Sequence, residues 1–311
     1  MPSLLDKQLL FVMGKGGVGR TTVAAALGLA AARRGRRTIV AEVAHQERLS
    51  SAFGHGPVPP DHEAEIAPGL WAVSIDPQAA MEEYLVQQIP VRPLADLLAR
   101  SAAFQHFAIA APGMRELLTI GKIWDLAQLE TRRTAGSAYD LVIVDAPATG
   151  HGLAFLRTPR TFADIAQVGP IARQGRRIQA FLGDPDRTGI VAVALPEEMP
   201  VNELLFLQAE LADDPGLGLG LVVLNGTHPD RFSSREATRL RAARGAGGSP
   251  AAQAALGVAL RAHDRAKAER AVRRGLARRC GQDPVALPRL AAAPLAPADY
   301  GALSERLEAA L

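Results

Sequence analysis

The stretch that decides the fold reads Gly14-Lys15-Gly16-Gly17-Val18-Gly19-Arg20-Thr21-Thr22. It directly follows an apolar run at residues 9–13 and directly precedes an alanine-rich run at residues 23–32. The order of strand, glycine-rich loop and helix is the context in which such a loop binds phosphate. Its glycines let consecutive backbone N–H groups face phosphate oxygens, and the N-terminus of the following helix adds partial positive charge. We therefore predict that residues 14–22 bind a nucleotide.

Two residues set this loop apart from an ordinary phosphate-binding loop. Lys15 lies one residue into it, and Arg20 stands before the threonine pair, where such loops have a lysine. Arginine keeps the positive charge but presents a broad planar fork, so the replacement is not conservative beside a crowded phosphate. The hydroxyl of Thr21 is the expected ligand of Mg²⁺.

The rest of the chain predicts a doubly wound α/β fold with a mostly parallel sheet. Near-continuous apolar runs, typical of parallel strands buried on both faces, recur at residues 38–43, 141–144, 190–195 and 221–224. Residues 70–75 alternate more and are expected nearer an edge. We predict one P-loop module over residues 1–311, with a helical insertion at about residues 77–138 and a second helical excursion at about residues 229–281.

The composition of the chain excludes several kinds of site and partner. The chain is 48% hydrophobic and has a single cysteine, Cys280, which excludes disulfide frameworks and paired-cysteine metal sites and favours a reducing cytoplasm. No apolar run approaches the roughly 18–20 residues that span a bilayer, so no integral membrane segment is expected. The formal net charge of +3 is too small to favour nucleic acid as a partner. Basic residues crowd residues 261–279, which indicates a solvated helix face or, as the alternative, a site for an acidic partner or a lipid surface.

A second motif narrows the class of nucleotide-binding protein that the sequence indicates. Residues 141–153 read Leu-Val-Ile-Val-Asp-Ala-Pro-Ala-Thr-Gly-His-Gly-Leu, so Asp145 ends a buried strand, where a carboxylate can hold a Mg²⁺-bound water beside phosphate. This segment resembles the Asp-Thr-Ala-Pro-Thr-Gly-His-Thr-Leu switch of the ArsA-type arsenical pump ATPases and the guided-entry targeting ATPases. The loop with its early lysine is similar to the deviant P-loop of the wider SIMIBI class.

The resemblance implies an ATPase that takes ATP and Mg²⁺ and works as a dimer, with Lys15 reaching the nucleotide of the opposite subunit. Such a dimer is a homodimer or a heterodimer with a paralogous ATPase. The resemblance also implies that Asn225 reads the adenine, through the donor and the acceptor of one amide. Either Pro288 or Pro294 would cover the other side of the base, and the residues alone do not choose between them.

The chain departs from the family pattern at two positions whose side chains act in ATP hydrolysis. Arg20 replaces the P-loop lysine, and Glu42 of the segment Glu42-Val43-Ala44-His45 replaces the aspartate that orients the attacking water. One extra methylene displaces a carboxylate by about 1 Å, and such a misplacement can cost about 10²-fold in rate. Together with Lys15, these residues form the expected catalytic set. A slow ATPase and a hydrolysis-impaired subunit that pairs with an intact paralogue both stay open.

The resemblance further implies a hydrophobic or membrane-protein client. The side chains that would line its groove, which ordinary core packing also explains, are Phe104, Phe107, Ile109, Met114, Leu117, Leu118 and Ile120. The family's metal- and metalloid-binding cysteines have no counterpart beyond Cys280. A MinD- or ParA-like positioning ATPase is the alternative class, although residues 304–311 are mildly acidic and do not form a basic amphipathic tail.

Overall fold

The computed structural model describes residues 3–43, 48–88, 101, 113–128, 132, 138–166, 169–214, 216–292 and 294–311. Of residues 85–88, 149–151, 166, 170 and 171 it describes the backbone alone. Ala44 and His45 lie outside the described residues, and so do Phe104, Phe107 and Ile109 of the predicted client groove.

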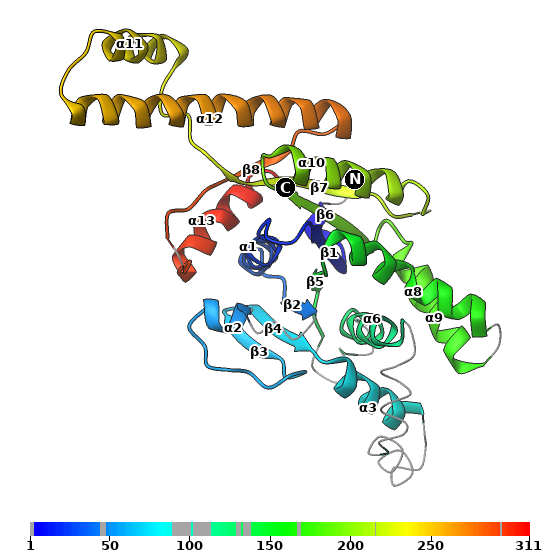
Figure 1. Ribbon diagram of the computed structural model, residues 1–311. Helices are drawn as coiled ribbons and strands as arrows, with labels where there is room; N and C mark the ends of the chain where they lie inside the picture. The colour runs from blue at the N-terminus through cyan, green and yellow to red at the C-terminus, as the bar shows by residue number, and fades with distance from the viewer. Residues whose placement is uncertain are drawn as a thin grey trace.

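One eight-stranded sheet forms the centre of the molecule (Figure 1). Its order is β3-β4-β2-β5-β1-β6-β7-β8, and every neighbouring pair is parallel except β3 and β4. The strands are β1 (Leu9–Gly14), β2 (Thr38–Val43), β3 (Ala64–Ala67), β4 (Leu70–Ile75), β5 (Leu141–Asp145), β6 (Thr188–Ala194), β7 (Leu219–Thr227) and β8 (Val285–Pro288). The predicted α/β fold with a mostly parallel sheet is confirmed.

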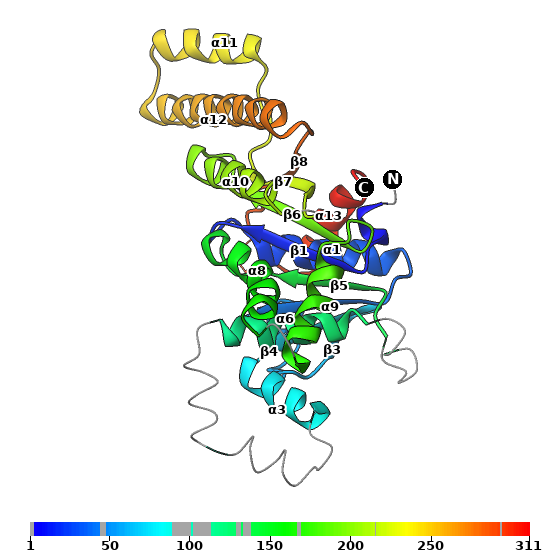
Figure 2. The same ribbon diagram turned by 90° about the vertical axis from the view of Figure 1, so that its right-hand side faces the viewer.

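Helices cover both faces of this sheet (Figures 1 and 2). A short helix η1 packs with α1 and α13 on one face, and α6, α8, α9 and α10 pack on the other. The bounds are η1 (Leu4–Asp6), α1 (Arg20–Arg33), α2 (Arg48–Ala52), α3 (Pro77–Gln88), α6 (Met114–Leu126), α8 (Thr149–Ala166), α9 (Pro170–Leu182), α10 (Glu198–Leu211) and α13 (Pro297–Glu308). The helical insertion predicted at about residues 77–138 is described only through α3, α6 and a few further residues, so its bounds stay a prediction.

Strand β1 shows why the central strands read as continuous apolar runs. Leu10 and Val12 face the cluster of α1 and α13, while Leu9, Phe11 and Met13 face the cluster of the opposite helices. Successive side chains of a strand point to opposite faces, and here both faces are covered. Every residue of β1 is therefore buried.

Residues 229–281 form a helical arm that stands out from the sheet (Figures 1 and 2). It consists of α11 (Ser234–Gly245) and the long helix α12 (Pro250–Cys280). Ser249 caps the start of α12, and Gly281, with a φ of 71°, ends it. The C-terminal part of α12 packs on the main core through Leu276. Among the described residues, no helix of the arm or elsewhere is long and apolar enough to cross a membrane.

Candidate nucleotide and magnesium site

The predicted loop connects β1 to α1 and requires glycine where it approaches its neighbours. A Cβ on Gly14 would lie 2.3 Å from the carbonyl oxygen of Val193, and one on Gly19 would lie 2.2 Å from Nδ2 of Asn225. Gly19 also has a φ of 89° and precedes the first residue of α1. These positions admit no side chain, so the loop backbone lies close against β6 and β7. Gly16 and Gly17 at its tip are exposed and open to a ligand.

Thr21 and Asp145 meet at the start of α1. Strand β5 pairs with β1, and the Thr21 hydroxyl donates to Oδ2 of Asp145 at 2.5 Å. The second oxygen, Oδ1, is buried and has no hydrogen-bond partner among the described residues. Burial raises the pKa of Asp145 above its ordinary value, and the hydrogen bond from Thr21 opposes this shift. A buried carboxylate with one unsatisfied oxygen beside a hydroxyl is an oxygen donor set that suits Mg²⁺, so the residues present fit the ion.

Arg20 does not lie free in the loop. Its guanidinium donates to the backbone carbonyl of Ala146, the residue that follows Asp145. Burial lowers the pKa of Arg20, and the charge of Asp145 opposes this shift. The side chain therefore links α1 to the segment that leads from β5 to α8.

Glu42 lies beside Asp145 at the carboxyl end of β2, because the two residues pair across β2 and β5. Its side chain is buried, and its Oε1 accepts hydrogen bonds from the backbone N–H groups of Arg48 at 3.0 Å and Leu49 at 3.3 Å. Oε2 lies 3.3 Å from the same Leu49 nitrogen. Burial raises the pKa of Glu42 to about 7, although these backbone hydrogen bonds oppose the shift. The carboxylate thus caps the N-terminus of α2.

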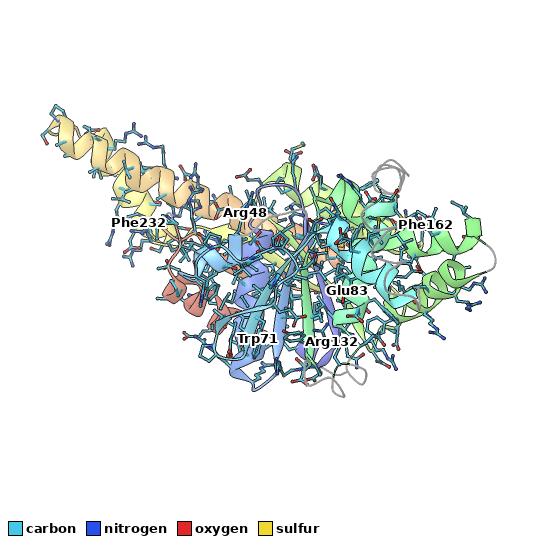
Figure 3. All side chains as sticks on the ribbon, turned by 90° about the horizontal axis from the view of Figure 1, so that it is seen from below. Arg48, Trp71, Glu83, Arg132, Phe162 and Phe232 are labelled. Atoms are coloured by element: carbon cyan, nitrogen blue, oxygen red, sulfur yellow. The ribbon has the colours of Figure 1, made fainter. Side chains whose placement is uncertain are left out.

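Arg48 is a residue of this site that the sequence did not single out. Figure 3 shows it at the end of the sheet opposite to Trp71 and Arg132, and thus at the end where Glu42 and Asp145 lie. Its side chain is exposed and has no hydrogen-bond or ion-pair partner among the described residues. Burial raises the pKa of both Glu42 and Asp145, whereas the Arg48 charge lowers both. Arg48 therefore adds positive charge near the two carboxylates.

Lys15 forms an ion pair within its own chain. Its Nζ lies 2.8 Å from Oε1 of Glu203 on α10, and both side chains are 36% exposed. Glu203 also lines a groove between α8 and α10, together with Leu153, Arg157 and Phe206. The sequence offers no local signal for this pair, because its members lie far apart in the chain.

Asn225 contacts the loop directly, because its Nδ2 donates to the backbone carbonyl of Val18 at 2.9 Å. Strand β7, which carries Asn225, pairs with β8 so that Thr227 lies opposite Pro288. Pro288 is half-buried beside this strand, whereas Pro294 lies beyond β8 and is exposed. The adenine roles of Asn225 and of either proline remain predictions.

The sheet order, the β1–α1 loop and the Thr21–Asp145 pair define the class of the protein as a P-loop NTPase. A family model described as anion-transporting ATPase matches residues 7–168, slightly more than half of the chain. ATPase BagA of Mycobacterium tuberculosis is 32% identical over 234 residues, which cover 74% of this chain and 68% of that protein.

Two further relatives carry informative names. ATPase get3 of Pyrenophora tritici-repentis is 26% identical over 226 residues, 70% of this chain and 62% of that protein. The arsenical pump-driving ATPase of Acidiphilium multivorum is 26% identical over 244 residues, 73% of this chain and 41% of that protein. The chain belongs to the ArsA family of anion-transporting ATPases. The resemblance drawn from residues 14–22 and 141–153 is confirmed.

Proposed function

We propose that the chain binds Mg·ATP in the loop of residues 14–22 and hydrolyses it slowly, as a dimeric ATPase that handles a hydrophobic or membrane-protein client. The observation that carries the nucleotide and magnesium site is the Thr21–Asp145 pair at the N-terminus of α1, with its unsatisfied buried oxygen. Family membership supports nucleotide binding independently. A cytoplasmic location accords with the single unpaired cysteine, Cys280.

Each residue of the site has a role in this proposal. The loop backbone and the positive end of α1 hold the phosphates. Thr21 and Asp145 hold Mg²⁺, which neutralises phosphate charge when it is bound. Asp145 binds the ion as a charged carboxylate, because the positive charge of Mg²⁺ offsets the cost of burying the negative charge of Asp145.

Thermal unfolding with and without Mg·ATP tests the site, because a ligand that binds only the folded state raises its stability. We expect a clear upward shift for the wild type and the loss of most of this shift in Thr21→Val and Asp145→Asn, in which ATP binds without the contribution of Mg²⁺. Thr238→Val on α11 and Asp186→Asn are matched controls away from the site and should keep the full shift. A full shift in both site variants would refute the proposed site.

We further propose that Lys15 acts across the dimer, in a homodimer or in a heterodimer with a paralogous ATPase. Its partial exposure beside the loop supports this role, since the side chain can reach the surface once it leaves Glu203. Client handling rests on family membership alone. Of the described residues named for the client groove, Ile120 is fully buried in the main core, which supports a packing role for that residue.

A hydrolysis-impaired subunit that pairs with an intact paralogue is the second candidate, and two contacts favour it. Glu42 uses its carboxylate to cap α2, and Arg20 donates to Ala146, so neither is committed to the phosphates. Reversion of both residues, Arg20→Lys with Glu42→Asp, should then raise ATP turnover by about 10²-fold, more than either change alone. Family-typical turnover of the wild type, with no gain on double reversion, would exclude this candidate.

A further inference from the structure

The helical arm, residues 229–281, carries a charge opposite to that of the rest of the molecule. It contains thirteen lysines and arginines but four aspartates and glutamates, a net charge of +9. The whole chain has a net charge of +3, so the remaining residues carry −6. The modest total charge therefore conceals a strong separation between a basic arm and an acidic body.

Most of the arm's cations form no ion pair with any residue that the structure describes. Three of the thirteen form ion pairs, namely Arg241 with Asp264, Arg270 with Asp230 and Arg273 with Asp283. The other ten are exposed and have no ion-pair partner in the described part of the chain: Arg231, Arg235, Arg239, Arg244, Arg261, Arg265, Lys267, Arg274, Arg278 and Arg279. A protein that used these residues only to stabilise its own fold would pair more of them.

The two helices hold these cations in a broad layer. Helix α12 has 31 residues, about 46 Å of helix at 1.5 Å per residue, and α11 lies along it. Figures 1 and 2 show this layer standing out from the sheet, on the side beyond α10. Along α12, Lys267, Arg274 and Arg278 follow each other at a spacing of seven and four residues, so they share one helix face. The charge thus extends over the length of the arm.

We propose that the arm docks on a bilayer surface that contains anionic phospholipids. Phosphate headgroups provide a plane of negative charge, which a broad cationic layer can contact at many points, and each cation close to such a surface contributes about fivefold in affinity. The acidic body is repelled by the same surface, so the molecule would approach with the arm first. Val258 is the one exposed large apolar side chain of the arm, so contact would be electrostatic at the level of the headgroups and reversible.

Nucleic acid fits these observations less well. Proteins that bind single strands stack bases on aromatic side chains, and the arm has one aromatic residue, Phe232, which is half-buried. A major groove admits a single helix, whereas the arm spreads its cations over two helices side by side. The membrane proposal is independent of the proposed ATPase activity, because no residue of the arm belongs to the nucleotide site.

Vesicle co-sedimentation of the full chain tests this inference. We expect binding to vesicles of phosphatidylcholine mixed with phosphatidylglycerol, little binding to pure phosphatidylcholine, and a steep loss of binding as salt is raised. The triple variant Lys267→Glu/Arg274→Glu/Arg278→Glu should lower the affinity by about 10²-fold or more. The variant Arg173→Glu/Arg176→Glu/Arg177→Glu makes the same charge change on α9 and should lower it less than about threefold.

Circular dichroism and a cooperative thermal unfolding transition like that of the wild type establish that both variants are folded. The proposal is overturned if the wild type binds neither kind of vesicle, or binds both equally. Equal losses in the arm and α9 variants would also overturn it, because net charge and not the arm would then govern binding. Tighter binding to duplex DNA than to the anionic vesicles would assign the arm to nucleic acid instead.

Discussion

At the scale of the residue, two opposing effects act on the pKa of Glu42. It is buried beside Asp145 and near Arg48, and its carboxylate caps the two N–H groups that begin α2. Capping favours the charged form, but burial outweighs it and raises the pKa to about 7. The folded protein therefore holds a proton on Glu42 at pH values where the unfolded chain releases it.

This shift makes stability depend on pH in a defined direction. Because the folded state binds the proton more tightly, the free energy of unfolding should fall as the pH rises from about 4.5 to about 7 and then level off, by about 3 kcal/mol in total. Glu42→Gln cannot titrate and should lose this contribution, while Asp61, whose pKa burial raises to about 6, keeps its own smaller one. Urea unfolding across this range, without Mg²⁺, measures the difference between the two proteins. Parallel pH profiles for wild type and variant would show that Glu42 is not the titrating group, and Glu116→Gln, on an exposed position of α6, is the control.

Arg48 is the second residue with a testable role. Arg20 already donates to Ala146, whereas the guanidinium of Arg48 has no partner among the residues that the structure describes and lies near Glu42 and Asp145. Arg48 can therefore supply positive charge to a terminal phosphate. We expect Arg48→Ala to weaken ATP binding by about 10-fold and ADP binding much less, with partial rescue in Arg48→Lys. Titration with each nucleotide checks this, and Arg115→Ala on α6 is the control. Equal losses for ATP and ADP would contradict contact with the terminal phosphate.

At the scale of the element, the Lys15–Glu203 pair connects the nucleotide loop to α10. An ion pair with both partners one-third exposed contributes at most about 1 kcal/mol, so it can be exchanged for a stronger partner. In the proposed dimer, that partner is the phosphate charge of the opposite subunit. The pair within one chain therefore competes with assembly.

Removal of this competition should favour the dimer. Glu203→Gln is expected to strengthen ATP-dependent dimerisation by up to about fivefold, and Lys15→Ala should weaken it while the fold persists. Sedimentation velocity with a non-hydrolysable ATP analogue measures both effects, with Glu198→Gln as a control on the exposed face of α10. Weaker dimerisation in Glu203→Gln would show that Glu203 supports assembly instead of opposing it.

The elements also show what a sequence can and cannot predict. The β1–loop–α1 unit was predicted because its signal is local: an apolar run, glycines at fixed positions and a helix directly after them. Strands β3 and β8 were not predicted, because each has four residues and forms only where a neighbouring strand offers its edge. The contacts of Lys15 with Glu203 and of Arg20 with Ala146 join distant segments, so they depend on the finished fold. The cap that Glu42 provides is local, but it was not predicted for another reason: α2 has only five residues and no periodic signal that marks a helix.

At the scale of the whole molecule, the nucleotide site and the basic arm occupy different parts of the structure. The site lies at the carboxyl ends of β1, β2 and β5, where an open parallel sheet binds its ligands. The arm leaves the sheet after β7, the strand that carries Asn225, and returns to it at β8, which ends with Pro288. Both strands that frame the arm thus border the predicted adenine side of the site.

Calorimetric titration of ATP into the protein, with Mg²⁺ and then with EDTA, tests most directly whether this chain is a magnesium-dependent nucleotide-binding protein. The Thr21–Asp145 arrangement predicts a single class of sites whose affinity rises by about 10-fold or more with Mg²⁺ in the wild type. In Asp145→Asn, which keeps the shape of the side chain but not its charge, ATP should still bind and the effect of Mg²⁺ should be lost. Binding by the wild type that is indifferent to Mg²⁺, or an undiminished Mg²⁺ effect in Asp145→Asn, would contradict the proposed site.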